Sequence, residues 1–107
     1  MTINDIEKEL EIGQVNPHRL SEFRDWLSAQ SSAMMDRQLE LQLIYSQFFY
    51  DNRPKWKSDK ALLMEWRITK AGSEELELEI SQKKITILLR AIASHLSVLN
   101  NSARNLY

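Results

Sequence analysis

The chain has 107 residues and a formal net charge of −1, which is the size of one domain. Its 43% hydrophobic and 27% charged residues are typical of a folded protein and exclude wholesale disorder. It has no cysteine, which excludes disulfides, zinc–thiolate sites and thiol catalysis. Because sheet proteins need glycine-bearing turns at short intervals, the two glycines and two prolines predict an all-α fold.

The first predicted helix covers residues 3–12. Ile3, Ile6 and Leu10 share one face of it, and Gly13 ends it. This opening stretch is acidic and has no apolar core, so we expect no signal peptide. No apolar run approaches the roughly 20 residues that a membrane helix needs. We therefore expect a cytoplasmic protein, in the host cytoplasm if a phage encodes it, with no membrane partner.

A long helix is predicted from about residue 17 to 50. Asn16 can cap it, and Pro17 suits the first helical position because its missing N–H has no intrahelical partner there. Phe23 and Ile44 occupy intermediate positions of a seam that recurs every seven residues. The seam consists of Leu20, Leu27, Met34, Leu41 and Phe48. This pattern resembles a coiled coil.

Beyond it, Asn, Asp and Pro mark a basic loop at 51–58. Ser58 can cap a helix over about 59–70, and Gly72-Ser73 predicts a kink or break before a second long helix over about 73–106. The seam of that last helix alternates steps of four and three. Its members are Leu78, Gln82, Ile85, Leu89, Ile92, Leu96, Leu99, Ala103 and Leu106.

Two seams of nearly equal length predict an antiparallel hairpin of two long helices, within one helical domain over 1–107. Two helices alone bury little surface, so we expect homo-oligomerisation to complete the core. Five apolar residues off the seams are the candidate oligomer interface: Leu43, Tyr45, Phe49, Ile87 and Leu88. The alternative is that they pack against the N-terminal helix within one subunit.

A search for catalytic or ligand-binding motifs finds none that is convincing. His18 and His95 have no partners at triad or metal-ligand spacing. The two glycines stand far apart, so there is no phosphate-binding loop. Glu75 and Glu79 have the i, i+4 spacing of a metal site, but no facing ligands accompany them. The sequence predicts no enzyme, no cofactor and no metal site.

The basic loop carries the one pattern that indicates a ligand. Cations and one aromatic residue alternate there, in Arg53, Lys55, Trp56, Lys57 and Lys60. Single-stranded nucleic acid is held by this combination, because cations neutralise phosphates and an aromatic face stacks on a base. The alternative is that Trp56 folds back near Phe49 and the lysines are merely solvated.

Several stretches stand in a familiar order. Trp26-Leu27 precedes Ser31-Ser32, the aromatic pair Phe49-Tyr50 closes the first long helix, and the basic loop follows. The strongest stretch is ISQKKITILLRAIASHLSVLNNSARNLY at 80–107. It holds Leu88-Leu89, Leu96, Leu99 and Asn100-Asn101-Ser102. From about Leu20 onward the chain resembles the UvsY recombination-mediator family of large tailed phages.

The resemblance implies a homo-oligomer that binds single-stranded DNA and helps a RecA-like recombinase displace the single-strand-binding protein. Such a mediator serves DNA recombination, repair and replication and performs no chemistry itself. The strand contacts would fall on the basic loop, with Lys83, Lys84 and Arg90 as secondary candidates. The chain departs from the family in having Leu43-Ile44-Tyr45-Ser46-Gln47 where such mediators tend to be basic, and in ending at Tyr107 where relatives continue with a tail.

The alternative function is a helical adaptor or inhibitor that contacts proteins and no nucleic acid. Tyr45, Phe49 and Trp56 would then be anchors for a protein partner. The two functions differ in their response to salt, because phosphate binding weakens steeply as salt rises and an aromatic protein contact does not.

Overall fold

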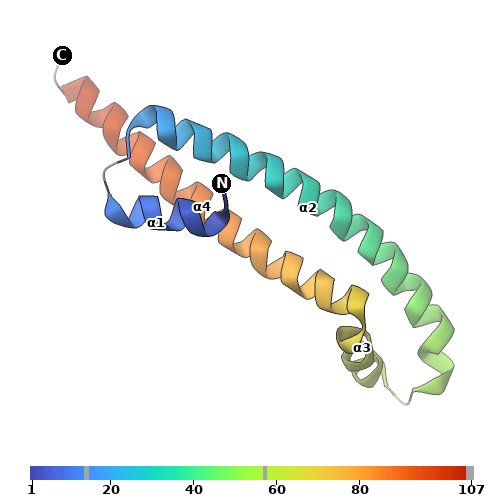
Figure 1. The fold of residues 1–107 in the computed structure, drawn as a ribbon. Helices are drawn as coiled ribbons and strands as arrows, with labels where there is room; N and C mark the ends of the chain where they lie inside the picture. Colours follow the sequence, from blue (N-terminus) through green and yellow to red (C-terminus); the bar gives the residue numbers. More distant parts are fainter. Residues whose placement is uncertain (14, 57, 106–107) are drawn as a thin grey trace. The chain divides into compact units, whose positions relative to one another are not determined.

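The computed structural model describes residues 1–13, 15–56 and 58–105. These residues are all-α, as predicted, and contain no strand. The helices are α1 (Ile3–Ile12), α2 (Pro17–Asn52), the short 3-10 helix η1 (Arg53–Lys55), α3 (Asp59–Ile68) and α4 (Lys70–Asn105) (Figure 1). Within the described ranges, no helix combines the length and the apolarity needed to cross a bilayer.

The chain divides into two compact units. The first unit consists of residues 1–31 and the chain from residue 83 onward, and the second unit consists of residues 32–82. Each long helix contributes one part to each of these units.

Capping residues set the ends of α1. The Thr2 side chain accepts a hydrogen bond from the Asp5 N–H (3.1 Å), and the Asp5 carboxylate accepts one from the Thr2 N–H (2.9 Å). At the other end, Gly13 has a φ of +79°, and its N–H donates to the Leu10 carbonyl. Many helices end at a residue in the left-handed conformation, and glycine adopts this conformation without strain. The predicted end of this helix is thus confirmed.

The start of α2 is also where the sequence placed it. The Asn16 side chain accepts a hydrogen bond from the Arg19 N–H (2.9 Å), and Pro17 is the first helical residue. The helix runs to Asn52, slightly beyond the predicted end. The Asn52 side chain there donates to the Phe48 carbonyl (2.8 Å).

The first unit has a core built from three helices. Its buried residues come from α1, α2 and α4 and are Ile6, Leu20, Phe23, Leu27, Ile85, Leu88 and Ile92. The packing buries the predicted seam residues Leu20 and Leu27 completely. Burial of these side chains is the main stabilising contribution to the unit, at about 1.5–3 kcal/mol for each large one.

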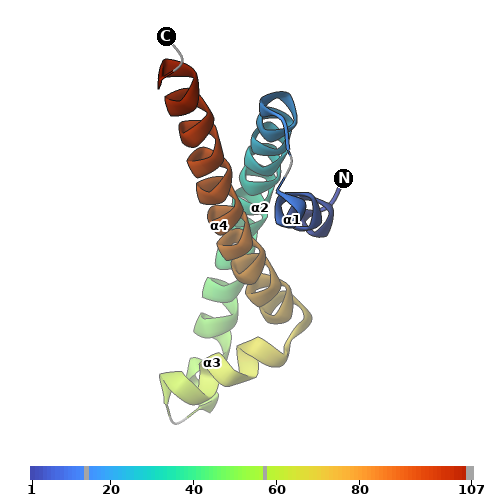
Figure 2. The same ribbon diagram turned by 90° about the vertical axis from the view of Figure 1, so that its left-hand side faces the viewer.

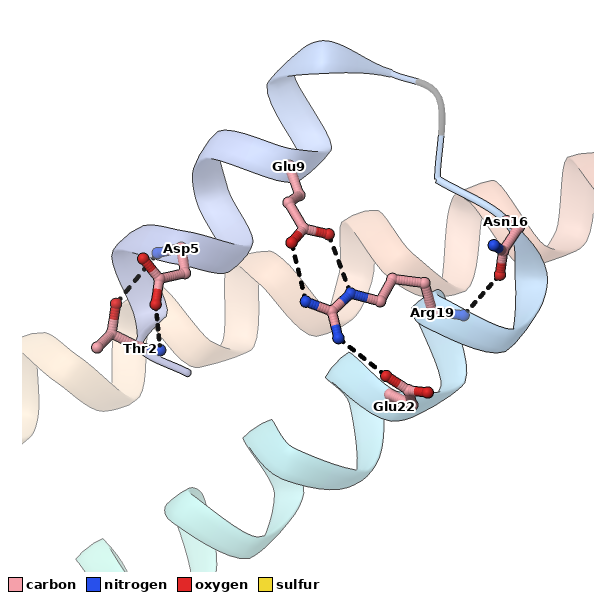
Figure 3. Close-up of polar contacts among 6 residues, drawn as sticks. All are labelled: Thr2, Asp5, Glu9, Asn16, Arg19 and Glu22. Atoms are coloured by element: carbon pink, nitrogen blue, oxygen red, sulfur yellow. Dashed lines mark hydrogen bonds and ion pairs between the residues drawn. The ribbon is translucent and has the colours of Figure 1, made fainter.

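An arginine joins α1 to α2 at the edge of this core (Figure 3). The Arg19 guanidinium donates through Nη2 and Nε to the two carboxylate oxygens of Glu9 (2.9 and 3.1 Å) and through Nη1 to Glu22 (2.9 Å). It also lies over the ring of Phe23, 4.6 Å from the centroid. The hydrogen bond from Arg19 lowers the pKa of the Glu9 carboxyl below its ordinary value of 4.5. The side chain therefore fixes α1 on α2 by charge and by stacking.

The second unit has a smaller core around Trp66. Trp66, Leu62 and Leu41 are fully buried. The rings of Tyr45 and Phe48 pack against the Trp66 ring, with centroids 5.2 and 5.3 Å away. Such tilted and edge-on pairs add stabilisation beyond the area they bury.

Polar contacts hold α2 to α4 within this second unit. Arg37 donates through Nε to Glu74 (2.8 Å) and through Nη1 to Glu40 (2.7 Å). The Gln42 side chain donates to Glu75 (3.4 Å).

The break between α3 and α4 lies at Thr69, not at Gly72-Ser73 as the sequence indicated. Thr69 is extended (φ −73°, ψ 158°); its hydroxyl accepts from the Gly72 N–H (3.0 Å) and donates to the Trp66 carbonyl (2.6 Å). Gly72 is buried, and a Cβ on it would stand 1.9 Å from that carbonyl oxygen. The glycine permits the close approach that turns the chain sharply into α4 (Figure 2).

The seam of α2 is less regular in the second unit than the sequence predicted. Leu41 is buried, but Ile44 is 44% exposed, although the pattern placed both on the seam. Apolar residues are dense here, and successive residues point about 100° apart around a helix, so one face cannot bury them all. In α4, Ile85 and Ile92 are buried, Leu99 is 40% exposed, and Leu106 lies outside the described residues.

Candidate nucleic-acid interface

The basic segment forms a short link between α2 and α3 in the second unit (Figure 1). Pro54 lies within η1, and the Trp56 that follows is extended (φ −120°, ψ 142°). Ser58 then caps α3, because its hydroxyl accepts from the Ala61 N–H (3.2 Å). Lys57 lies outside the described residues. The link is thus held at both ends by regular structure.

Arg53 is committed to contacts within the link. Its Nε lies 2.7 Å from the Asp59 carboxylate, and its Nη1 donates to the Trp56 carbonyl (2.9 Å). These bonds tie the start of the link to the first residue of α3. A guanidinium whose donors are used in this way has fewer left for a phosphate, so Arg53 is a structural clip more than a free cation.

Lys55, Trp56 and Lys60 offer the accessible surface of the link. All three are exposed, and neither lysine forms an ion pair with another described residue. Trp56 is 37% exposed and makes no ring contact with a described aromatic residue. Phe49 packs on Tyr45 instead, with centroids 6.0 Å apart. Trp56 and Phe49 therefore form no ring pair among the described residues.

Tyr50 is an aromatic residue beside the link that the sequence marked only as part of the pair Phe49-Tyr50 and not as a candidate site residue. It lies in the last turn of α2 and is 79% exposed, whereas its neighbour Phe49 is half-buried. The signal was present in the sequence, since adjacent residues of a helix point in different directions and only one of such a pair can face a core.

The secondary candidates belong to the first unit, whereas the link belongs to the second. Lys83, Lys84 and Arg90 are exposed residues of α4. Lys83 takes part in an interaction within the protein. Lys84 lines a groove between α1 and α4.

The five candidate oligomer-interface residues differ in accessibility. Leu43 and Ile87 are 67% and 64% exposed. Tyr45 and Phe49 are half-buried in the aromatic packing around Trp66. Leu88 is only 7% exposed and lines the groove with residues of α1, so it serves the core of its own unit. Leu88 therefore follows the alternative considered for these residues, which is packing against the N-terminal helix within one subunit.

Within the part of the chain that the structure describes, no three His, Asp or Glu side chains gather where they could hold a metal ion. The fold and the link define an all-helical protein with a basic, aromatic-bearing connection between two capped helices. Comparison of the chain with protein-family models, with curated proteins and with solved structures found no match.

Proposed function

We propose that the protein binds single-stranded DNA through the link between α2 and α3 and acts as a recombination mediator, without catalysing a reaction. The observation that supports this best is the exposed Trp56 beside the exposed lysines Lys55 and Lys60, which form no ion pair with a described residue. Lysines neutralise phosphates, and a tryptophan face holds a base with about 1–3 kcal/mol.

The clip formed by Arg53 adds to the case. Its bonds to Asp59 and to the Trp56 carbonyl restrict the backbone on which the exposed side chains are mounted. A strand that binds there orders less of the protein than it would on a free loop, so more of the contact energy remains as affinity.

The mediator role extends this proposal by the resemblance to the UvsY family. The protein would hold the strand in a form that favours nucleation of a RecA-like recombinase over the single-strand-binding protein, by shifting a binding equilibrium. The proposal includes an antiparallel hairpin of the long helices as the scaffold. It also includes a homo-oligomer, because several weak patches bound to one strand multiply their affinities.

Fluorescence anisotropy of a labelled oligo-dT strand, measured from low to moderate salt, tests this function. We expect wild-type binding that weakens as salt rises. The double variant Lys55→Ala/Lys60→Ala should reduce the slope of log K against log salt by about 1.4, because each contact with a single strand contributes about 0.7. Trp56→Ala should weaken binding at every salt concentration, by about 5- to 150-fold if one stacked base is lost.

Lys8→Ala is the matched control, because Lys8 is an exposed lysine of α1 and lies in the other unit. It should leave the slope unchanged. A wild-type protein that ignores the strand even at low salt would refute DNA binding. If binding is found, a RecA-type recombinase assayed on DNA covered by single-strand-binding protein tests the mediator role.

A protein-contacting adaptor is the second candidate, and exposed apolar residues on α2 favour it. Met35, Leu39 and Leu43 recur at steps of four and are 61%, 65% and 67% exposed. A partner that covered them would be held by apolar burial, which salt weakens little. Binding to a protein with no salt dependence, and no binding to the strand, would favour this function.

A further inference from the structure

A groove of about 400 Å³ runs between α1 and α4 within the first unit. Leu10 of α1 and Leu88 and Ala91 of α4 line it with apolar surface. Ile87 also lines it and is 64% exposed, so a large apolar side chain is left in water at this place. A second cavity of about 120 Å³ shares Leu10 and extends the apolar surface along α4. Covering this surface would be favourable.

The α1 wall of the groove is acidic. Glu7 and Glu11 line it at i, i+4 spacing, and neither forms an ion pair with another described residue. Glu9 of the same helix, in contrast, is occupied by Arg19. The α4 wall carries Lys84 and His95, so the acidic side of the groove is the one formed by α1. Two carboxylates beside apolar surface favour a ligand that is itself apolar and places positive charge against α1.

The chain itself offers a complementary element in α3. Leu62 and Trp66 of this helix are buried, and its other face is exposed except at Arg67, which is half-buried. That face carries residues at i, i+3, i+4, i+7 and i+8, the spacing of a single helical stripe. The stripe consists of Lys60, Leu63, Met64, Arg67 and Ile68.

The chemistry of this α3 stripe matches the groove. Leu63, Met64 and Ile68 are 37%, 65% and 76% exposed, so three apolar side chains are available to enter an apolar groove. Lys60 and Arg67 stand two turns apart, and neither forms an ion pair with another described residue. Helix-in-groove recognition uses this arrangement of apolar anchors flanked by charges.

We propose that the groove between α1 and α4 binds α3 of a second copy of the chain, with Lys60 and Arg67 facing Glu7 and Glu11. The contact joins two different surfaces, so it is head-to-tail and adds copies in one direction until a ring closes or a filament grows. It leaves Lys55 and Trp56 outside the contact and uses Lys60 within it, so in the assembly the strand is held by Lys55 and Trp56. The inference rests on the proposed function in one respect, namely that copies of the chain assemble.

Two charge-reversal variants test the contact by sedimentation velocity. The groove variant is Glu7→Lys/Glu11→Lys, and the α3 variant is Lys60→Glu/Arg67→Glu. Each alone should weaken self-association about tenfold or more, because like charges then meet across the contact. Mixed in equal amounts, the two should assemble in alternation, since the α3 of the groove variant meets the intact groove of the α3 variant and the two reversed surfaces carry opposite charges.

Combining all four substitutions in one chain restores opposite charges and should restore self-association. Lys8→Glu and Asp36→Lys are matched controls at exposed positions outside the contact and should assemble as the wild type does. Circular dichroism of every variant checks that it is folded. A wild type that stays a monomer, a mixture that forms no complex, or a four-fold variant that is not restored would each overturn the proposal.

The strand-binding assay separates this inference from the proposed function. The groove variant leaves Lys55, Trp56 and Lys60 unchanged, so its oligo-dT binding is the reading that separates strand binding from assembly; the α3 variant loses the strand contact proposed for Lys60 and is used for assembly alone. Charge-restored assembly without any binding to the strand would support the contact and reject the DNA function. Strand binding by chains whose self-association is unchanged by the charge reversals would support the DNA function and reject the contact.

Discussion

At the scale of single residues, Gly72 determines how α3 turns into α4. A Cβ placed on Gly72 would lie 1.9 Å from the Trp66 carbonyl oxygen, so the position has no room for a side chain. We expect Gly72→Ala to destabilise the protein by about 2 kcal/mol or more, because backbone must move to admit a methyl group. The thermal midpoint should fall by roughly 10 °C in a protein of this size.

Gly13→Ala is the control for this substitution. Gly13 has a positive φ, but open space surrounds the position of its Cβ. The cost there should be near 1 kcal/mol, from backbone conformation alone. Replacing an ordinary glycine inside a helix by alanine stabilises the protein by about 1 kcal/mol. Such a gain at Gly72 would contradict the close approach to Trp66.

The pair formed by Glu9 and Arg19 predicts a pH dependence. The hydrogen bond from Arg19 lowers the pKa of Glu9 in the folded state. A carboxyl with a lowered pKa binds its proton more readily in the unfolded chain, so its contribution to stability is present above the ordinary value of 4.5 and is lost as the pH falls through the folded value.

Glu9→Gln should therefore lower the thermal midpoint at pH 7 and make little difference at a pH well below 4.5. Urea unfolding of the variant and the wild type across this range measures the effect. Glu77→Gln is the control, because Glu77 is an exposed residue in the other unit. A difference between Glu9→Gln and the wild type that stays constant with pH would show that the pair acts through packing alone.

Capping residues were predictable one by one, while contacts between distant residues were not. Gly13, Asn16 and Ser58 have the roles that their neighbours in the sequence indicate. Gly72 is needed because the carbonyl of Trp66, six residues earlier, lies close to it. The local sequence pattern does not contain this contact and predicts a helix break at Gly72 instead. The ion pair between Arg53 and Asp59 likewise could not be predicted by counting positive charges in the loop.

At the scale of elements, the link between α2 and α3 contains two kinds of cation. Arg53→Ala should weaken strand binding by loosening the link while changing the salt slope little, because its guanidinium is bonded to Asp59 and to Trp56. Lys55→Ala should reduce the slope by about 0.7. Anisotropy titrations at four or more salt concentrations measure both. An equal reduction by the two variants would mean that Arg53 leaves Asp59 to meet a phosphate.

The helical seams were predictable where apolar residues are sparse. In the first unit, Leu20 and Leu27 lie at seven-residue spacing with only Phe23 and Trp26 as large apolar residues between them, and both are buried. Farther along α2, apolar residues crowd between positions 39 and 45, and periodicity alone does not say which of them face inward. The aromatic packing on Trp66 selects Tyr45 and leaves Leu43 and Ile44 exposed.

At the scale of the whole molecule, the two compact units predict two regions of local stability. Ile6 in the first unit and Leu62 in the second are both fully buried. Replacing either by alanine should cost about 2–5 kcal/mol at the site. Because local opening follows compact units, Ile6→Ala should speed amide exchange mainly in residues 1–31 and from residue 83 onward, and Leu62→Ala mainly between residues 32 and 82.

Hydrogen exchange with mass spectrometry measures this directly, and each variant is the control for the other. Equal acceleration throughout the chain in both variants would show one cooperative unit. The division into units was not predictable from the sequence, because a seam describes one face of a helix and does not say which segment covers it. The all-α fold was predictable, since scarce glycine and long periodic segments leave no other regular structure.

The burial of the three tryptophans also gives the protein a built-in optical signal. Trp66 lies in an apolar core among aromatic rings, its indole N–H unbonded to any described residue, so its emission should be blue-shifted and shielded from soluble quenchers. Trp56 meets water, so it should emit at longer wavelength and be quenched by iodide, and Trp26 is intermediate. Light emitted at the red edge of the spectrum therefore reports the link selectively, without any attached dye.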